Sequence, residues 1–193
     1  MATVWWWKLP KAEDEELTIP PKVCGDSLAG SEVKSVFQGA SGDLNEHANP
    51  KFPREGGGDS PGAFCELSAD GTKVGFRVQG PSWGKTRAEL AKSHEQVTEL
   101  GPAHGGYRKT GGVMTLYLPC PTKKIPEAEL FVTVESDIAD PEYAPSKELK
   151  QGITKLAHLT GYTARTLAHK YQCEGADELP DGPVQLRAGD GKL

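Results

Sequence analysis

The sequence lacks the features that define several broad classes of protein. No run of 18 apolar residues occurs, so we expect no membrane-spanning helix. The first residues do not make a complete signal peptide. Basic residues are in the minority, with 22 Lys and Arg against 27 Asp and Glu, and the net charge of −5 argues against a nucleic-acid partner. Hydrophobic content is only 36%, whereas 23 glycines and 15 prolines predict many turns.

The cysteines form no Cys-x-x-Cys pair, which argues against a zinc or thioredoxin-type site. We therefore expect no metal and no cofactor. The four are Cys24, Cys65, Cys120 and Cys173. An even, widely spaced set favours disulfides formed in an oxidising compartment, although four buried thiols in a cytosolic protein are the alternative. Three connectivities are open, and we favour Cys24–Cys65 with Cys120–Cys173, since each bond then closes one half of the chain.

The beginning of the chain carries an unusual cluster of indoles. Three tryptophans are adjacent, Trp5, Trp6 and Trp7. Lys8 follows them, and Trp is favoured where a bilayer meets water, so we interpret the cluster as a membrane-proximal stub. A strand edge or a free tail is the alternative. The acidic run 13–16 and the Pro20-Pro21 pair predict a stalk, which makes residues 1–21 stub and stalk and confines membrane contact to the tryptophans.

The longest helical pattern runs from Ser146 to Cys173. Its inward stripe recurs at three- and four-residue steps: Leu149, Ile153, Leu156, Ala157, Thr160, Ala164, Leu167 and Tyr171. Ser146 is placed to cap the first turn. At 1.5 Å per residue such a helix spans roughly 40 Å, enough to cover a small sheet.

Two hairpins and two short helices precede this long helix. Strands are predicted at 63–68 and 73–79 around Asp70-Gly71, and again at 113–118 and 129–135, because apolar residues alternate in each. The first short helix has Ser31 as its cap and a shared apolar face formed by Val33, Val36 and Phe37. The second has a Thr86–Glu89 capping box and an inner face formed by Leu90, Ala91, His94 and Val97.

This order of elements predicts an α+β fold, in which helices pack on an antiparallel sheet of about four strands. Helix, hairpin, helix, hairpin, helix suggests a duplicated α-β-β unit, with halves 22–80 and 81–179 in one domain, 22–179. Residues 180–193 are predicted to be a flexible tail.

Two short motifs resemble catalytic signatures. Gly25-Asp26-Ser27-Leu28 spells the signature of GDSL-type lipases and esterases, in which the serine is the nucleophile. The chain lacks the Asp-x-x-His that such enzymes use, and two prolines interrupt the strand that should precede the serine. The stretch 80–86 resembles a phosphate loop but has three residues between its glycines where four are needed. We keep a secreted hydrolase using Ser27 as the alternative function.

Two glycine-rich loops, 39–61 and 101–112, are the remaining places for a site. If they meet at one end of the sheet, they form a binding rim of six residues: His47, Phe52, Arg54, His104, Tyr107 and Arg108. The plainer interpretation is that both segments are connecting loops.

The stretch from Val23 to Val33, together with Phe64-Cys65-Glu66-Leu67, resembles the domain-of-unknown-function lipoproteins exported by actinobacteria. In that family a cysteine precedes a helix and pairs with a cysteine of the first strand. The resemblance implies a Cys24–Cys65 bond, an envelope location and an α+β fold, and it brings no activity. We therefore expect a non-catalytic, membrane-anchored extracytoplasmic domain of the cell envelope that binds a protein or a wall component.

Overall fold

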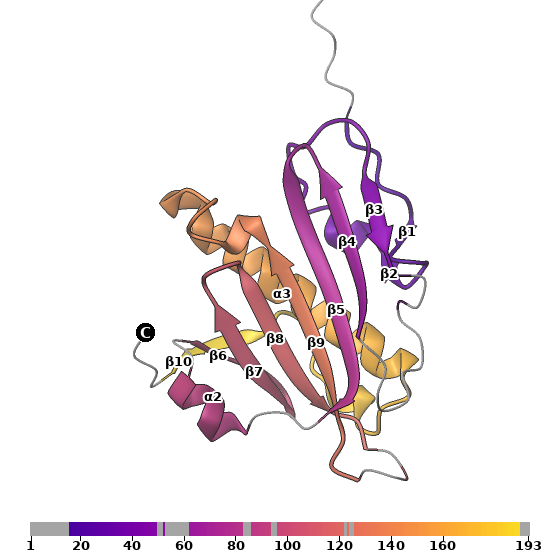
Figure 1. Ribbon diagram of the computed structural model, residues 1–193, viewed down its shortest axis with the longest axis vertical. Helices are drawn as coiled ribbons and strands as arrows, with labels where there is room; N and C mark the ends of the chain where they lie inside the picture. Colours follow the sequence, from indigo (N-terminus) through magenta and orange to yellow (C-terminus); the bar gives the residue numbers. More distant parts are fainter. Residues whose placement is uncertain are drawn as a thin grey trace, which may run out of the picture.

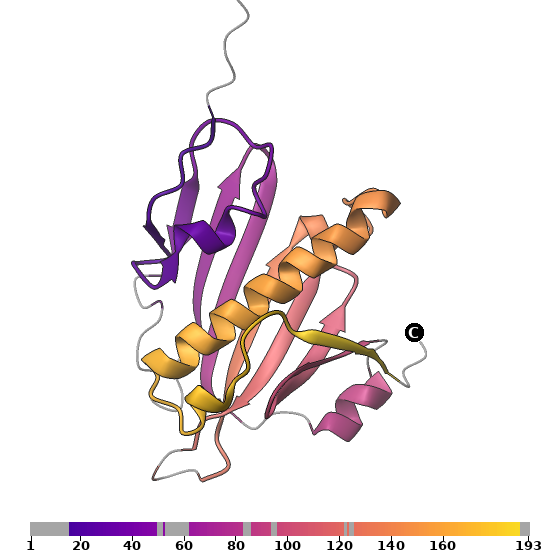
Figure 2. The same ribbon diagram turned by 180° about the vertical axis from the view of Figure 1, so that it is seen from behind.

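One antiparallel sheet of eight strands dominates the structure, with the order β10-β6-β7-β8-β9-β5-β4-β3 (Figure 1). The computed structural model describes residues 16–49, 52, 62–82, 86–93, 96–121, 123 and 126–189. The long helix α3 (Ser146–Lys170) lies diagonally over β8 and β9 on one face of this sheet (Figure 2). The α+β prediction is confirmed, whereas the prediction of about four strands is wrong.

Both predicted hairpins are present and meet in the centre of the sheet. The strands are β3 (Asn45–Ala48), β4 (Ala63–Ala69), β5 (Thr72–Ser82), β6 (Gln96–Leu100), β7 (Ala103–Arg108), β8 (Val113–Pro119), β9 (Glu129–Ser136) and β10 (Gln185–Ala188). Hairpin β4–β5 turns at Asp70 and Gly71, both at positive φ. Strand β5 pairs with β9, so that Phe76 lies opposite Val134 and the two halves of the chain share one core.

The strands absent from the prediction lack apolar alternation. Strand β3, inside the predicted loop 39–61, reads Asn-Glu-His-Ala. Strand β7, inside the predicted loop 101–112, contains Gly105 and Gly106, and a Cβ on Gly105 would lie 1.9 Å from the carbonyl oxygen of Thr115. Glycine is therefore required in this strand by close packing of neighbouring backbones.

Strands β6 and β10 lie in segments that were predicted as helix and tail. Val97 belongs to β6 and not to the inner face of a helix, because α2 (Arg87–Ser93) is short. Strands β6 and β7 lie between α2 and the second hairpin, so the second half of the chain is not an α-β-β unit. The stretch 180–193, predicted as a tail, contributes the edge strand β10, which pairs with β6.

The helix caps agree with the prediction in one case of three. The backbone N–H of Thr86 donates to Glu89 at 2.8 Å, and the N–H of Glu89 donates to the Thr86 hydroxyl at 3.3 Å, which confirms the capping box of α2. Helix α1 (Gly30–Val33) is preceded by Ala29, and α3 is preceded by Pro145. Neither helix has a side-chain cap, so the capping roles predicted for Ser31 and Ser146 are wrong: each serine already lies inside its helix.

The core lies between α3 and the sheet. Its largest fully buried side chains include Phe76, Met114, Leu116, Leu130, Leu156, Leu159 and Leu167. At Gly152 a Cβ would lie 1.8 Å from the carbonyl oxygen of Ile138, so the N-terminal half of α3 approaches the backbone of the 3₁₀ turn η1 (Asp137–Ala139) directly. This approach fixes where the first turns of α3 stand relative to the end of β9.

Two disulfides cross-link the fold, and both have the predicted pairing. Cys24–Cys65 ties β4 to the two-stranded ribbon β1 (Lys22–Val23) and β2 (Leu28–Ala29), which with α1 lies beside α3 (Figure 2). Cys120–Cys173 joins the end of β8 to the segment after α3. Two such bonds favour an oxidising, extracytoplasmic setting.

Within the described part of the chain, no helix combines the length and apolarity needed to cross a membrane. The predicted stub at Trp5, Trp6 and Trp7 lies outside the described residues.

Candidate functional site

The segment that carries the GDSL-like motif is a tight left-handed turn. Cys24, Gly25 and Asp26 have φ values of 56°, 59° and 62°, a conformation that non-glycine residues avoid. The backbone N–H of Ser27 closes the turn by donating to the carbonyl of Val23 at 3.1 Å. Successive left-handed residues are strained, and such strain persists only where the surroundings hold it in place.

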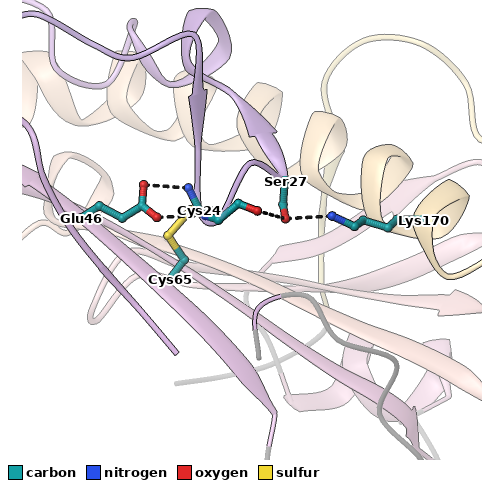
Figure 3. Close-up of a disulfide and its surroundings, with 6 residues drawn as sticks. Cys24, Ser27, Glu46, Cys65 and Lys170 are labelled. Carbon is teal, nitrogen blue, oxygen red and sulfur yellow. Dashed lines mark hydrogen bonds between the residues drawn. A yellow bond between two sulfur atoms is a disulfide. The ribbon is translucent and has the colours of Figure 1, made fainter. Parts of the chain in front are cut away.

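Three contacts hold this turn (Figure 3). The disulfide fastens Cys24 to β4. The carboxylate of Glu46 accepts the backbone N–H groups of Cys24 and Gly25, each at 2.9 Å. The ammonium of Lys170, at the end of α3, donates to the Ser27 hydroxyl at 3.0 Å, and that hydroxyl lies 3.3 Å from the carbonyl oxygen of Gly25.

A serine beside a lysine is also the arrangement of Ser-Lys hydrolases, in which a neutral amine removes the serine proton. Here the geometry suits a tether better. Lys170 is the last residue of α3, where the helix dipole favours a cation. The backbone N–H groups of Cys24 and Gly25 are bonded to Glu46 and that of Ser27 to the carbonyl of Val23, so none of the three is free to bind an oxyanion. Ser27 is also only 6% exposed.

A cleft of about 860 Å³ opens at the N-terminal end of α3. It lies between the β4–β5 turn and the start of the helix, which stand at the same end of the molecule (Figure 2). Four segments line it: residues 36–39 after α1, 70–72 in the hairpin turn, 137–138 in η1, and 143–155 with gaps, running into α3. Its volume is in the range of small-molecule and peptide-side-chain sites.

The lining of this cleft is polar and predominantly acidic. Three carboxylates, on Asp70, Asp137 and Glu148, face one amine, on Lys155. Asp137 is held by the backbone N–H of Lys73, with its two oxygens at 3.3 and 3.2 Å from that nitrogen. Hydrogen bonds thus fix part of the lining before any ligand arrives.

Tyr143 supplies the aromatic component of the cleft. Its side chain is 69% exposed, and it is the one large hydrophobic side chain among the described residues that is exposed to solvent. Tyr143 was not among the residues predicted from the sequence, although an aromatic residue between Pro141 and Pro145, directly before a helix, is a recognisable signal. An exposed ring on a loop that a rigid helix positions is a common ligand contact.

The sheet face opposite α3 carries a row of rings at its centre. His104, Tyr117 and Phe131 are cross-strand neighbours on β7, β8 and β9. Ring centroids lie 5.8 Å apart for His104 and Tyr117 and 4.9 Å apart for Tyr117 and Phe131. Burial, and then the carboxylate of Glu129, raises the pKa of the Tyr117 phenol. Cross-strand aromatic pairs stabilise a sheet, which accounts for the row without a ligand.

The six predicted rim residues do not form one cluster. Arg54 lies outside the described residues, and Phe52 is buried. His47 stands on β3, and His104 stands on β7, with four strands between them. Tyr107 is buried on the α3 side of the sheet.

The hydroxyl of Tyr107 donates to the carbonyl of Ala139 at 2.6 Å, so this residue supports the core. Arg108 is exposed, and its Nε donates to the carbonyl of Thr110. A binding role for any of the six stays a prediction.

No group of three His, Cys, Asp or Glu residues is placed to hold a metal ion within the ranges that the structure describes. No protein-family model, curated protein or solved structure matches the chain.

Proposed function

We propose that this protein is a non-catalytic, extracytoplasmic domain of a membrane-anchored cell-envelope protein. It binds a protein or a wall component, and the cleft at the N-terminal end of α3 holds that ligand. The cleft carries the proposal: about 860 Å³ of space is lined by polar and charged side chains together with the exposed ring of Tyr143. Its volume is in the range of ligand sites, and its lining is more polar than that of most of them.

The two disulfides support the location. Thiols of a cytosolic protein are kept reduced, whereas all four cysteines here are paired, in two bonds that join residues 41 and 53 positions apart. Protein purified from the envelope and denatured without reductant should expose no reactive thiol. Four reactive thiols would remove this support.

Retention of envelope material tests the binding function. Immobilised protein is incubated with two purified fractions from an actinobacterium, cell-wall sacculi and detergent-solubilised envelope proteins. We expect one fraction to be retained, and the double variant Y143L/E148Q to retain much less of it. The matched control is E142Q, which removes an exposed carboxylate one residue from Tyr143 that does not line the cleft.

The proposal is overturned if the wild-type protein retains neither fraction, or if Y143L/E148Q retains as much as E142Q does. Both substituted side chains are exposed, so a loss of binding with an unchanged urea midpoint reports on the cleft and not on folding.

A second candidate function is hydrolysis by Ser27, and the observation that favours it is the 3.0 Å contact with Lys170. An ester-substrate panel separates it from binding. Activity that disappears in both S27A and K170M would establish a Ser-Lys hydrolase. The binding proposal predicts that the panel detects no turnover by the wild-type protein.

A further inference from the structure

We infer that the ligand of the cleft presents a positively charged alkylammonium group, which binds against the ring of Tyr143 and the carboxylate of Glu148. The inference rests on the proposed function, because it names the chemistry that the same cleft recognises. It is carried by three features together: the open cleft, the exposed ring of Tyr143 and the excess of negative charge in the lining.

The charge balance of the cleft selects the sign of the ligand. The lining carries three carboxylates and one amine, those of Asp70, Asp137 and Glu148 against that of Lys155. The Lys155 amine donates to the side-chain oxygen of Gln38 at 3.5 Å, so it already has a partner inside the lining. The whole chain adds to this field with its net charge of −5. An anionic ligand would meet repulsion, and a cation is attracted.

Glu148 is the carboxylate most available to a ligand. Asp137 is engaged by the backbone N–H of Lys73, and Asp70 accepts the hydroxyl of Ser41 at 3.4 Å. Glu148 is exposed in the first turn of α3, and its carboxylate has no hydrogen-bond or ion-pair partner within the described residues. The helix N-terminus also favours its negative charge.

Tyr143 gives the cleft a second means of recognising a cation. The face of an aromatic ring carries partial negative charge and attracts an ammonium group placed over it. A ring and a carboxylate in the lining of one cleft can provide two sides of a cation-binding cage. A neutral apolar ligand would use the ring alone and gain nothing from Glu148.

Nuclear magnetic resonance titration of the full chain tests the inference. The probe is Nα-acetyl-lysine methylamide, and its control is Nα-acetyl-norleucine methylamide, which has the same carbon stem without the charge. We expect the lysine probe to shift the amide signals of residues 143–152 and to bind at least about fourfold more tightly than the norleucine probe, as the smallest effects of the ring and of the carboxylate combine to give. Added salt should weaken the lysine probe only, because it screens charge.

Three variants separate the interactions. Y143F keeps the ring and should bind the lysine probe as the wild type does, whereas Y143L should bind roughly two- to thirty-fold more weakly. E148Q should bind about two- to fivefold more weakly. E142Q is the matched control and should bind unchanged.

Two amine-bearing sources, a lysine-containing peptide and a muropeptide with a free side-chain amine, are then compared with their acetylated forms. Acetylation of the amine should abolish most of the binding of whichever source, the peptide or the muropeptide, is the natural ligand.

Equal binding of the lysine and norleucine probes, or equal binding by Y143L and wild type, would overturn the inference. If that happens while Y143L/E148Q still loses envelope material, the cleft remains the binding site and only the ligand chemistry is wrong. If the variant retains envelope material fully, the proposed function itself fails.

Discussion

Removing the Cys24–Cys65 bond should destabilise the protein and release the left-handed turn that it holds. The bond joins residues 41 positions apart. The loop-entropy relation gives about 4 kcal/mol at 25 °C for a closed loop of this length. The Cys120–Cys173 bond, with a separation of 53, gives about 4 kcal/mol as well. Because total stability is commonly only about 5–15 kcal/mol, either loss is a large share.

Urea unfolding of C24A/C65A and C120A/C173A measures these losses, and each variant serves as the control for the other. Because the loop-closure entropy depends on the logarithm of loop length, the losses of stability in the two variants should differ by only about 0.2 kcal/mol on account of loop length. Hydrogen exchange locates the local effect. The Ser27 amide, which bonds to Val23, should exchange faster in C24A/C65A than in C120A/C173A at equal global stability. The reasoning is refuted if C24A/C65A loses less than about 1 kcal/mol, or if exchange at Ser27 does not distinguish the two variants.

Three further predictions concern individual residues. E46Q removes the charge from a carboxylate that accepts two backbone N–H groups and should lower the free energy of unfolding by about 1–2 kcal/mol, read from the urea midpoint. Because the pKa of Tyr117 is raised in the folded state, the stability that its phenol contributes is present below about pH 10 and is lost as the pH rises above it. Burial is the larger cause of the raised pKa and the carboxylate of Glu129 is the smaller. In E129Q, alkaline titration of tyrosinate absorbance should give a lower pKa for Tyr117, and an unchanged pKa would contradict the contribution of Glu129. In G105A the new Cβ would lie 1.9 Å from a backbone oxygen, so the free energy of unfolding should fall by more than about 3 kcal/mol. In G75A the new Cβ meets only the flexible side chain of Glu135, so the free energy of unfolding should fall by less. Equal decreases in the two variants would disprove the close-packing argument.

The elements that the sequence determined by itself are those with a local apolar period. Helix α3 and the hairpins β4–β5 and β8–β9 follow from the spacing of Leu, Val and Phe, because such spacing reports directly which face a segment buries. The turn at Asp70-Gly71 and the capping box at Thr86 are equally local. The sequence left three disulfide connectivities open, and the favoured one, in which each bond closes one half of the chain, is the one that the structure has.

Tertiary structure alone decided the remaining strands and the candidate site. Strands β3, β7 and β10 have polar or glycine-rich sequences, and main-chain hydrogen bonds to a neighbouring strand define them. Ser27 and Lys170 are 143 residues apart, and the cleft gathers four segments around Tyr143. Contacts between distant segments produce no periodic pattern in the sequence of either segment, because each contact depends on a residue far away in the chain.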